Sequence, residues 1–225
     1  MHHDLINYCK KEWHAFLNHD FVGRVADGSL DTVNFYHYLQ QDFLFLKHYA
    51  RAFALAIYKS QSLTDISSTL TILSNIIENE ISAHVTYCKS WGLSEHALEN
   101  ALEDVATVAY TRYVLDRGIS GDLTELHAAL APCALGYAEI GRRLINDPLT
   151  KLEGNPYRSW IELYASENSQ NFARTQSLLL DHLIADIKPD STHWIGICET
   201  FKTATRMEIA FWQQALDIKS GKDRN

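Results

Sequence analysis

Apolar residues recur every three or four positions along most of the chain, the spacing that places them on one face of an α-helix. We find no convincing segment with the apolar–polar alternation of a half-buried strand. The pattern predicts helices over about 4–18, 20–27, 32–60, 64–91, 104–117, 122–146, 155–166, 168–186 and 191–218, with a short turn over 94–100. The chain is therefore expected to be all-α and to form a multi-helix bundle.

The bundle is expected to be one domain spanning 1–225. Only four prolines and ten glycines occur, and no Pro-rich or Gly/Ser-rich stretch divides the chain. The breaks are local: Asp27-Gly28-Ser29 ends one helix, and Asp31 is placed to cap the next. The charged tail, 219–225, is expected to fray.

The charge balance restricts the class of partner. The formal net charge is −8, and the basic residues form no run. Nucleic acids and anionic membranes bind proteins largely through lysine and arginine, so neither is expected as a partner. No apolar run approaches the roughly 18 residues that a membrane span needs.

Cysteine usage favours a reducing compartment. Cys9, Cys88, Cys133 and Cys198 lie far apart without a CxxC pair, which argues against a zinc site or a disulfide framework. The N-terminus lacks the apolar core of a secretory signal. We therefore expect a cytoplasmic protein without a bound metal.

Reactive side chains interrupt the apolar faces of four predicted helices. Asp42, Cys133 and Glu208 each stand near the middle of such a face. The face predicted over 64–91 consists of Leu70, Leu73, Ile77, Glu80, His84, Tyr87 and Trp91. A buried thiol is usually inert, a buried acid usually caps a helix or pairs with arginine, and Glu80 with His84 fits a structural pair. The faces alone predict a helical protein with a polar cavity.

Pro132 gives Cys133 a special position. Proline inside a helix removes a backbone hydrogen bond. If the helix breaks there, Cys133 stands in the first turn of a new segment, where the helix dipole favours thiolate and burial opposes it. The alternative is that Pro132 only bends the helix around the core.

Four segments in register resemble the TenA/thiaminase II family. They are FVGRVADGSLDTVNFYHYLQQDFLFLKHYARAFALA at 21–56, AALAPCALGYAEIG at 128–141, YRSWIELYAS at 157–166 and RMEIAFWQQAL at 206–216. The resemblance covers nearly the whole chain. It implies an all-α fold of the haem-oxygenase type, a homotetramer and no cofactor.

The resemblance also implies a small-molecule substrate. Family members hydrolyse aminopyrimidines in thiamin salvage, converting 4-amino-5-aminomethyl-2-methylpyrimidine and water into 4-amino-5-hydroxymethyl-2-methylpyrimidine and ammonia, and many cleave thiamin weakly. By position, Cys133 matches the nucleophile of the Cys-containing branch, Asp42 the carboxylate that holds the pyrimidine edge, and Glu208 the acid/base. The matching substrate-binding residues are Phe45, Tyr110, Tyr137 and Tyr164. Phe45 stands where some relatives have tyrosine, so a hydroxyl is missing there.

The chemistry suits these residue types. Addition of a thiolate to pyrimidine C6 pushes electrons toward the leaving group on the C5 methylene, which is covalent catalysis. One carboxylate can carry protons to and from the reacting groups, while another stabilises the electron-rich ring. Flat aromatic walls suit a flat ring.

Two alternatives remain at this stage. A metal or haem redox protein on the same fold would use Glu80 and His84 as iron ligands or His14 as a haem ligand, and an absorption spectrum would reveal it. A non-catalytic regulatory protein would need a recognition surface, but we find no helix-turn-helix and no basic face. The preferred leaving group cannot be read from one sequence.

Overall fold

The computed structural model describes residues 1–218, except for the side chain of Asn79. Its elements are α1 (His2–Tyr8), α2 (Lys10–Leu17), α3 (Asp20–Asp27), α4 (Thr32–Lys59), α5 (Leu63–Asn75), the π-helical turn η1 (Ile76–Ile81), α6 (Ser82–Ser90), α7 (Glu95–Glu99), α8 (Val105–Ser120), α9 (Leu123–Asn146), α10 (Arg158–Ala165), α11 (Glu167–Ile184) and α12 (Thr192–Leu216). Residues 1–218 contain no strand, which confirms the all-α prediction. The predicted frayed tail, 219–225, lies outside the described residues.

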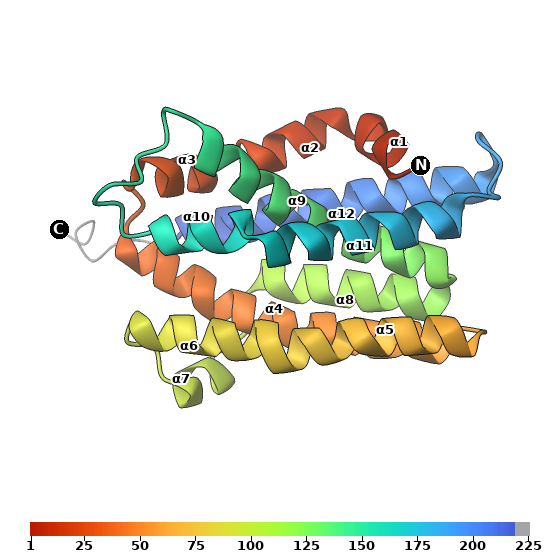
Figure 1. The fold of residues 1–225 in the computed structure, drawn as a ribbon, viewed down its shortest axis with the longest axis horizontal. Helices are drawn as coiled ribbons and strands as arrows, with labels where there is room; N and C mark the ends of the chain where they lie inside the picture. The colour runs from red at the N-terminus through yellow and green to blue at the C-terminus, as the bar shows by residue number, and fades with distance from the viewer. Residues whose placement is uncertain (219–225) are drawn as a thin grey trace.

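The long helices run side by side along the long axis of the molecule (Figure 1). Helices α9 and α12 pack against each other at the centre, where α9 also contacts α8, α10 and α11. Helix α4 packs on α5 and α8, and α2 covers α12. Predicted site residues lie on five helices. Helices α4, α8, α9 and α12 surround a common interior, and α10, which carries Tyr164, packs against α9.

Aromatic side chains fill one end of this interior. The rings of Phe21 and Trp212 stack with centroids 4.7 Å apart, and Trp212 also contacts Tyr38, Trp160 and Phe16. All five side chains are almost completely buried. Rings in such contact add roughly 0.5–1.5 kcal/mol per pair beyond the burial of their area. This wall holds α2, α3, α4, α10 and α12 in fixed relation beside the site.

The helix predicted over 64–91 contains a π-helical turn, and this changes which face is buried. Thr69 is buried before the turn, Ile76 at its first residue and His84 after it, whereas Leu70 and Ile77 are about half exposed. A π-turn closes its hydrogen bonds one residue later than an α-turn, so it shifts the buried face by one position. The predicted face is therefore wrong at Leu70 and Ile77, because it assumed a constant period.

Two further boundaries differ from the sequence prediction. The helix predicted over 4–18 is interrupted at Cys9, whose backbone leaves the helical region at φ −113° and ψ 34°. Asp31 occupies the N-cap position of α4 as predicted, yet its side chain makes no capping hydrogen bond. No helix within residues 1–218 is both long and apolar enough to cross a membrane.

Candidate active site

Asp42 lies on α4, buried, with polar neighbours from three helices. The Tyr38 hydroxyl donates to its Oδ2 over 3.3 Å, and His84 Nδ1 lies 3.4 Å from the same oxygen. Trp160 Nε1 in turn donates to the Tyr38 hydroxyl over 3.1 Å. Burial raises the pKa of the Asp42 carboxyl, although His84 and Tyr38 oppose the rise. The side chain is thus held in one orientation and pointed into the bundle.

In a neutral His84 ring, the hydrogen bonds determine which of the two ring nitrogens carries the proton. Its Nε2 lies 2.9 Å from the Leu39 carbonyl oxygen, which can only accept, so Nε2 carries the proton. Neutral Nδ1 is then an acceptor, and a hydrogen bond to Asp42 needs one further proton on either partner. His84 therefore pairs with Asp42, and the predicted pairing of Glu80 with His84 is wrong.

Glu208 lies on α12 with only 1% of its surface exposed. The Tyr110 hydroxyl of α8 donates to its Oε1 over 2.8 Å. Burial raises the pKa of the Glu208 carboxyl to about 8, and the charge of Asp42 adds to the rise. A carboxyl with such a pKa can both release and accept a proton near neutral pH.

Cys133 lies on α9, facing the same interior. It keeps part of its surface accessible, while Pro132 and Ala134 on either side are buried. Burial, together with the charges of Glu208, Asp42 and Glu80, raises the pKa of its thiol well above the ordinary value. The resting group is therefore a neutral thiol that needs a base.

Pro132 does not break α9. The helix is continuous over Leu123–Asn146 with Pro132 inside it. Cys133 consequently has no helix N-terminus beside it, and the predicted dipole effect on its thiol is wrong. Pro132 thus lies within a continuous helix, and the bend around the core that the alternative predicts stays a prediction.

The predicted aromatic residues form two connected groups around these side chains. The Phe45 ring lies 4.9 Å from that of Tyr110. The Tyr137 ring lies 4.8 Å from that of Tyr164 and 5.0 Å from that of Trp212. The first group is next to Glu208, and the second leads through the Tyr164–Trp160 contact at 4.8 Å to the side of Asp42. The structure thus brings all seven predicted site residues into one region.

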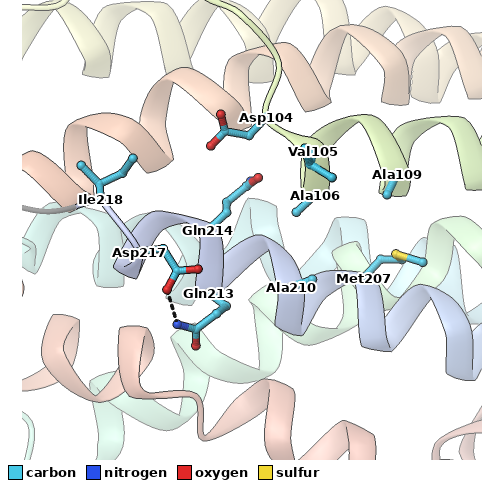
Figure 2. A pocket seen from close by; sticks show the side chains of 10 residues that line it. All are labelled: Asp104, Val105, Ala106, Ala109, Met207, Ala210, Gln213, Gln214, Asp217 and Ile218. Carbon is cyan, nitrogen blue, oxygen red and sulfur yellow. Dashed lines mark hydrogen bonds between the residues drawn. The ribbon is translucent and has the colours of Figure 1, made fainter.

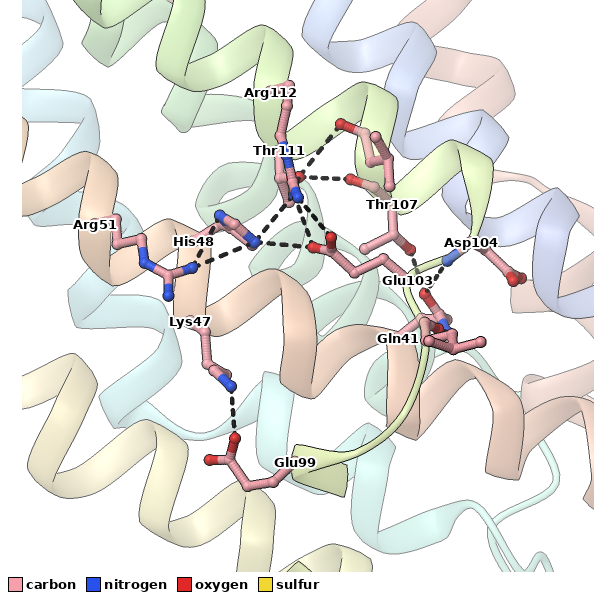
Figure 3. A network of polar contacts seen from close by, with 12 residues as sticks. Gln41, Lys47, His48, Arg51, Glu99, Glu103, Asp104, Thr107, Thr111 and Arg112 are labelled. Atoms are coloured by element: carbon pink, nitrogen blue, oxygen red, sulfur yellow. Dashed lines mark hydrogen bonds and ion pairs between the residues drawn. The ribbon is translucent and has the colours of Figure 1, made fainter. Parts of the chain in front are cut away.

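A polar network sets the position of α8, which carries Tyr110 (Figure 3). The buried Gln41, beside Asp42 on α4, donates to the Leu102 carbonyl oxygen over 2.9 Å. Its Oε1 accepts from Asp104 N at 2.9 Å and from the Thr107 hydroxyl at 2.7 Å. The side chain of Asp104, the N-cap residue of α8, makes no capping hydrogen bond. Gln41 instead accepts a hydrogen bond from a backbone N–H at this helix start. The network ties the start of α8 to the helix that holds Asp42.

Tyr38, Trp160 and Gln41 were missed by sequence reasoning. Tyr38 stands one turn before Asp42, on the apolar face of the same helix. The i, i+4 spacing of a hydroxyl and a carboxylate was an available signal. Trp160 and Gln41 act through contacts between distant segments, which one sequence does not reveal.

A surface groove elsewhere is a poor candidate for the reaction. It has a volume of about 590 Å³ and lies between the start of α8 and the end of α12 (Figure 2). Its lining is mostly small or apolar, with Val105, Ala109 and Met207 among the residues, and contains none of Asp42, Cys133 or Glu208. Within residues 1–218, no three His, Cys, Asp or Glu side chains are grouped closely enough to hold a metal ion.

The TENA/THI-4/PQQC family model matches residues 8–218, and this chain belongs to that family. An aminopyrimidine aminohydrolase from Halalkalibacterium halodurans is 36% identical over 205 residues, covering 90% of this chain and 89% of that protein. A solved Silicibacter structure, described as a TenA family transcription regulator, has a TM-score of 0.88 at 36% identity over 95% of both chains. A Shewanella domain with a heme oxygenase-like fold covers 96% of this chain with a TM-score of 0.74 at 13% identity, and it confirms the predicted fold type alone.

Proposed function

We propose that this protein is an aminopyrimidine aminohydrolase of thiamin salvage that acts through Cys133. The observation that carries the proposal is the grouping of Cys133 with the buried carboxyls of Asp42 and Glu208 between aromatic rings. The name of the Halalkalibacterium relative supports the same reaction. The substrate is 4-amino-5-aminomethyl-2-methylpyrimidine.

The reaction begins with the thiol. Glu208 takes the proton of Cys133. The raised pKa of the Glu208 carboxyl makes it a stronger base and eases this transfer, whereas the raised pKa of the thiol opposes it. Sulfur bonds to ring carbon C6, and an electron pair moves onto the C5–C4–N3 part of the ring. Asp42 holds the amino group and a protonated N3, so it stabilises this electron-rich adduct.

The adduct then expels nitrogen from the methylene on C5. The C–N bond breaks with its electron pair on nitrogen, and water forms a C–O bond at the same carbon. Glu208 first gives the proton from the thiol to the departing ammonia and then receives the proton that water loses. The C–S bond breaks, and the aromatic ring is restored. Of the two protons that Glu208 has taken, one returns to sulfur and one leaves with ammonia as ammonium.

The proposal is tested with the purified protein and two substrates. We expect ammonia and hydroxymethylpyrimidine in equal amounts from the aminomethylpyrimidine, and slower release of the same alcohol from thiamin. Product identity is read by mass spectrometry and ammonia by a coupled assay. Absence of turnover with both compounds would overturn the proposal.

A regulatory role is a second candidate, because the Silicibacter structure is described as a transcription regulator. The net charge of −8 works against DNA binding, which depends on phosphate neutralisation. Specific DNA binding at physiological salt, without turnover of any aminopyrimidine, would favour that role.

A further inference from the structure

Glu80 lies on the π-helical turn η1, close to the residues of the candidate active site. Ile77 and Glu78 on the same turn are exposed, whereas Glu80 is largely shielded from solvent. The turn shifts the register between α5 and α6, and Glu80 lies within it. Single π-turns inside helices occur frequently at functional sites.

The charge of Glu80 acts on the residues of the candidate active site. It contributes to the raised pKa of Cys133, of Tyr49 and of Tyr164. Asp42 in turn acts on Glu80, whose pKa burial raises to about 7. Glu80 therefore lies within electrostatic range of both the thiol and the acid that holds the ring edge.

Glu80 differs from the other two acids in having no protein partner. Asp42 is held by Tyr38 and His84, and Glu208 receives the hydroxyl of Tyr110. His84, one turn after Glu80, directs its ring to Leu39 and Asp42 instead. Among the described residues, nothing donates a hydrogen bond to Glu80 or forms an ion pair with it. A shielded carboxylate without a partner is costly, and a bound cation would offset that cost.

We propose that Glu80 binds the positively charged nitrogen of the leaving group on the C5 methylene. This inference rests on the proposed function. On the pyrimidine ring, C5 lies between C4, whose amino group contacts Asp42, and C6, which Cys133 attacks. A group on C5 is therefore placed between these two contacts. Glu80 lies in η1, about one helical turn before His84, whose Nδ1 is 3.4 Å from Asp42 Oδ2.

The chemistry of substrate and product explains what Glu80 contributes. An alkyl amine is an ammonium ion at neutral pH, as the lysine side chain is. The amine already carries the proton with which it departs as ammonia, so Glu80 needs only to bind it. The hydroxymethyl product is neutral and leaves Glu80 without a partner. Glu80 thus selects substrates with a cationic leaving group and favours release of the alcohol.

The test is calorimetric titration in the Cys133→Ser background, where substrate binds without turnover. The ligands are the aminomethylpyrimidine and the hydroxymethylpyrimidine. We expect Glu80→Gln to raise the Kd of the charged ligand about tenfold to hundredfold, the value of a charge-assisted hydrogen bond. The Kd of the neutral ligand should change less than about twofold, which also shows that the variant is folded.

Glu78→Gln is the matched control, because Glu78 lies on the same turn and is exposed. It should leave both Kd values unchanged. Equal effects of Glu80→Gln on the two ligands, or no effect on either, would overturn the role of Glu80. Failure of the parent Cys133→Ser protein to bind either ligand would instead refute the proposed function.

Discussion

Burial gives Asp42, Glu208 and Cys133 acid–base properties that the same side chains lack in water. Each pKa is raised, since the charged form of each group loses hydration inside the bundle. Single hydrogen bonds from Tyr38 and Tyr110 only partly offset that loss. Glu208 can therefore exchange a proton near neutral pH, whereas Cys133 is held as a neutral thiol.

Asp42→Asn tests whether Asp42 binds the amino group and the protonated N3 of the pyrimidine. An amide cannot accept two hydrogen bonds with the strength of a carboxylate, and it cannot stabilise a protonated ring nitrogen. We expect a higher KM and a lower kcat with the aminomethylpyrimidine, with kcat/KM reduced about tenfold or more. Steady-state kinetics measure both values. If KM and kcat stay unchanged, Asp42 is only structural.

The free energy of unfolding of Glu208→Gln, compared with that of the wild type at two pH values, tests the raised pKa of the Glu208 carboxyl. The pKa of this carboxyl rises from 4.5 to about 8 on folding, so the folded state binds the proton more tightly. Its contribution to stability is full below pH 4.5 and is lost as the pH rises through 8. Glutamine has no proton to lose. The variant should match the wild type at pH 5 and exceed its unfolding free energy at pH 9 by about 1–4 kcal/mol.

Urea denaturation at the two pH values measures this difference, with the exposed Glu78→Gln as the control. The same gain or loss of stability at pH 5 and pH 9 would contradict a raised pKa at Glu208.

Regularity of the individual helices decides how much of the site the sequence could predict. Asp42, Cys133 and Glu208 lie on α4, α9 and α12, where the helical period is constant enough for the apolar face to place them inside. The face predicted over 64–91 includes Glu80 correctly but is wrong at Leu70 and Ile77, because the π-turn changes the period within the helix. The partners of Asp42 also escaped prediction, since Trp160 and His84 arrive from other elements. The all-α class follows from the period alone.

Helices α9 and α10 approach closely at Gly141, and this contact fixes Tyr164. A Cβ at Gly141 would lie 2.3 Å from the backbone carbon of Tyr164, which cannot yield as a flexible side chain would. Gly141→Ala should therefore destabilise the protein by about 1–3 kcal/mol and reduce activity. Thermal denaturation and kcat/KM are the measurements.

Gly23→Ala is the control for this element. A Cβ at Gly23, inside α3, meets nothing within 4 Å. Alanine there should stabilise the helix by about 0.5–1 kcal/mol and leave activity intact. A stable, fully active Gly141→Ala protein would show that the spacing of α9 and α10 does not matter to the site.

On the scale of the whole molecule, the bundle encloses acids in its interior. Acids 42, 80 and 208 reach the same region from α4, η1 and α12, although these elements are far apart in sequence. The aligned region covers 90% of this chain and 89% of the Halalkalibacterium aminohydrolase, so the bundle accounts for nearly the full length of that relative. The fold thus supplies a shielded interior that holds three carboxyl groups near Cys133.

The most direct test of the account is ammonia release from the aminomethylpyrimidine by Cys133→Ser, beside Cys198→Ser as a buried-thiol control. We predict that Cys133→Ser abolishes release while still binding the hydroxymethylpyrimidine, and that Cys198→Ser keeps its activity. Ammonia release by Cys133→Ser at the wild-type rate would contradict covalent catalysis by this residue.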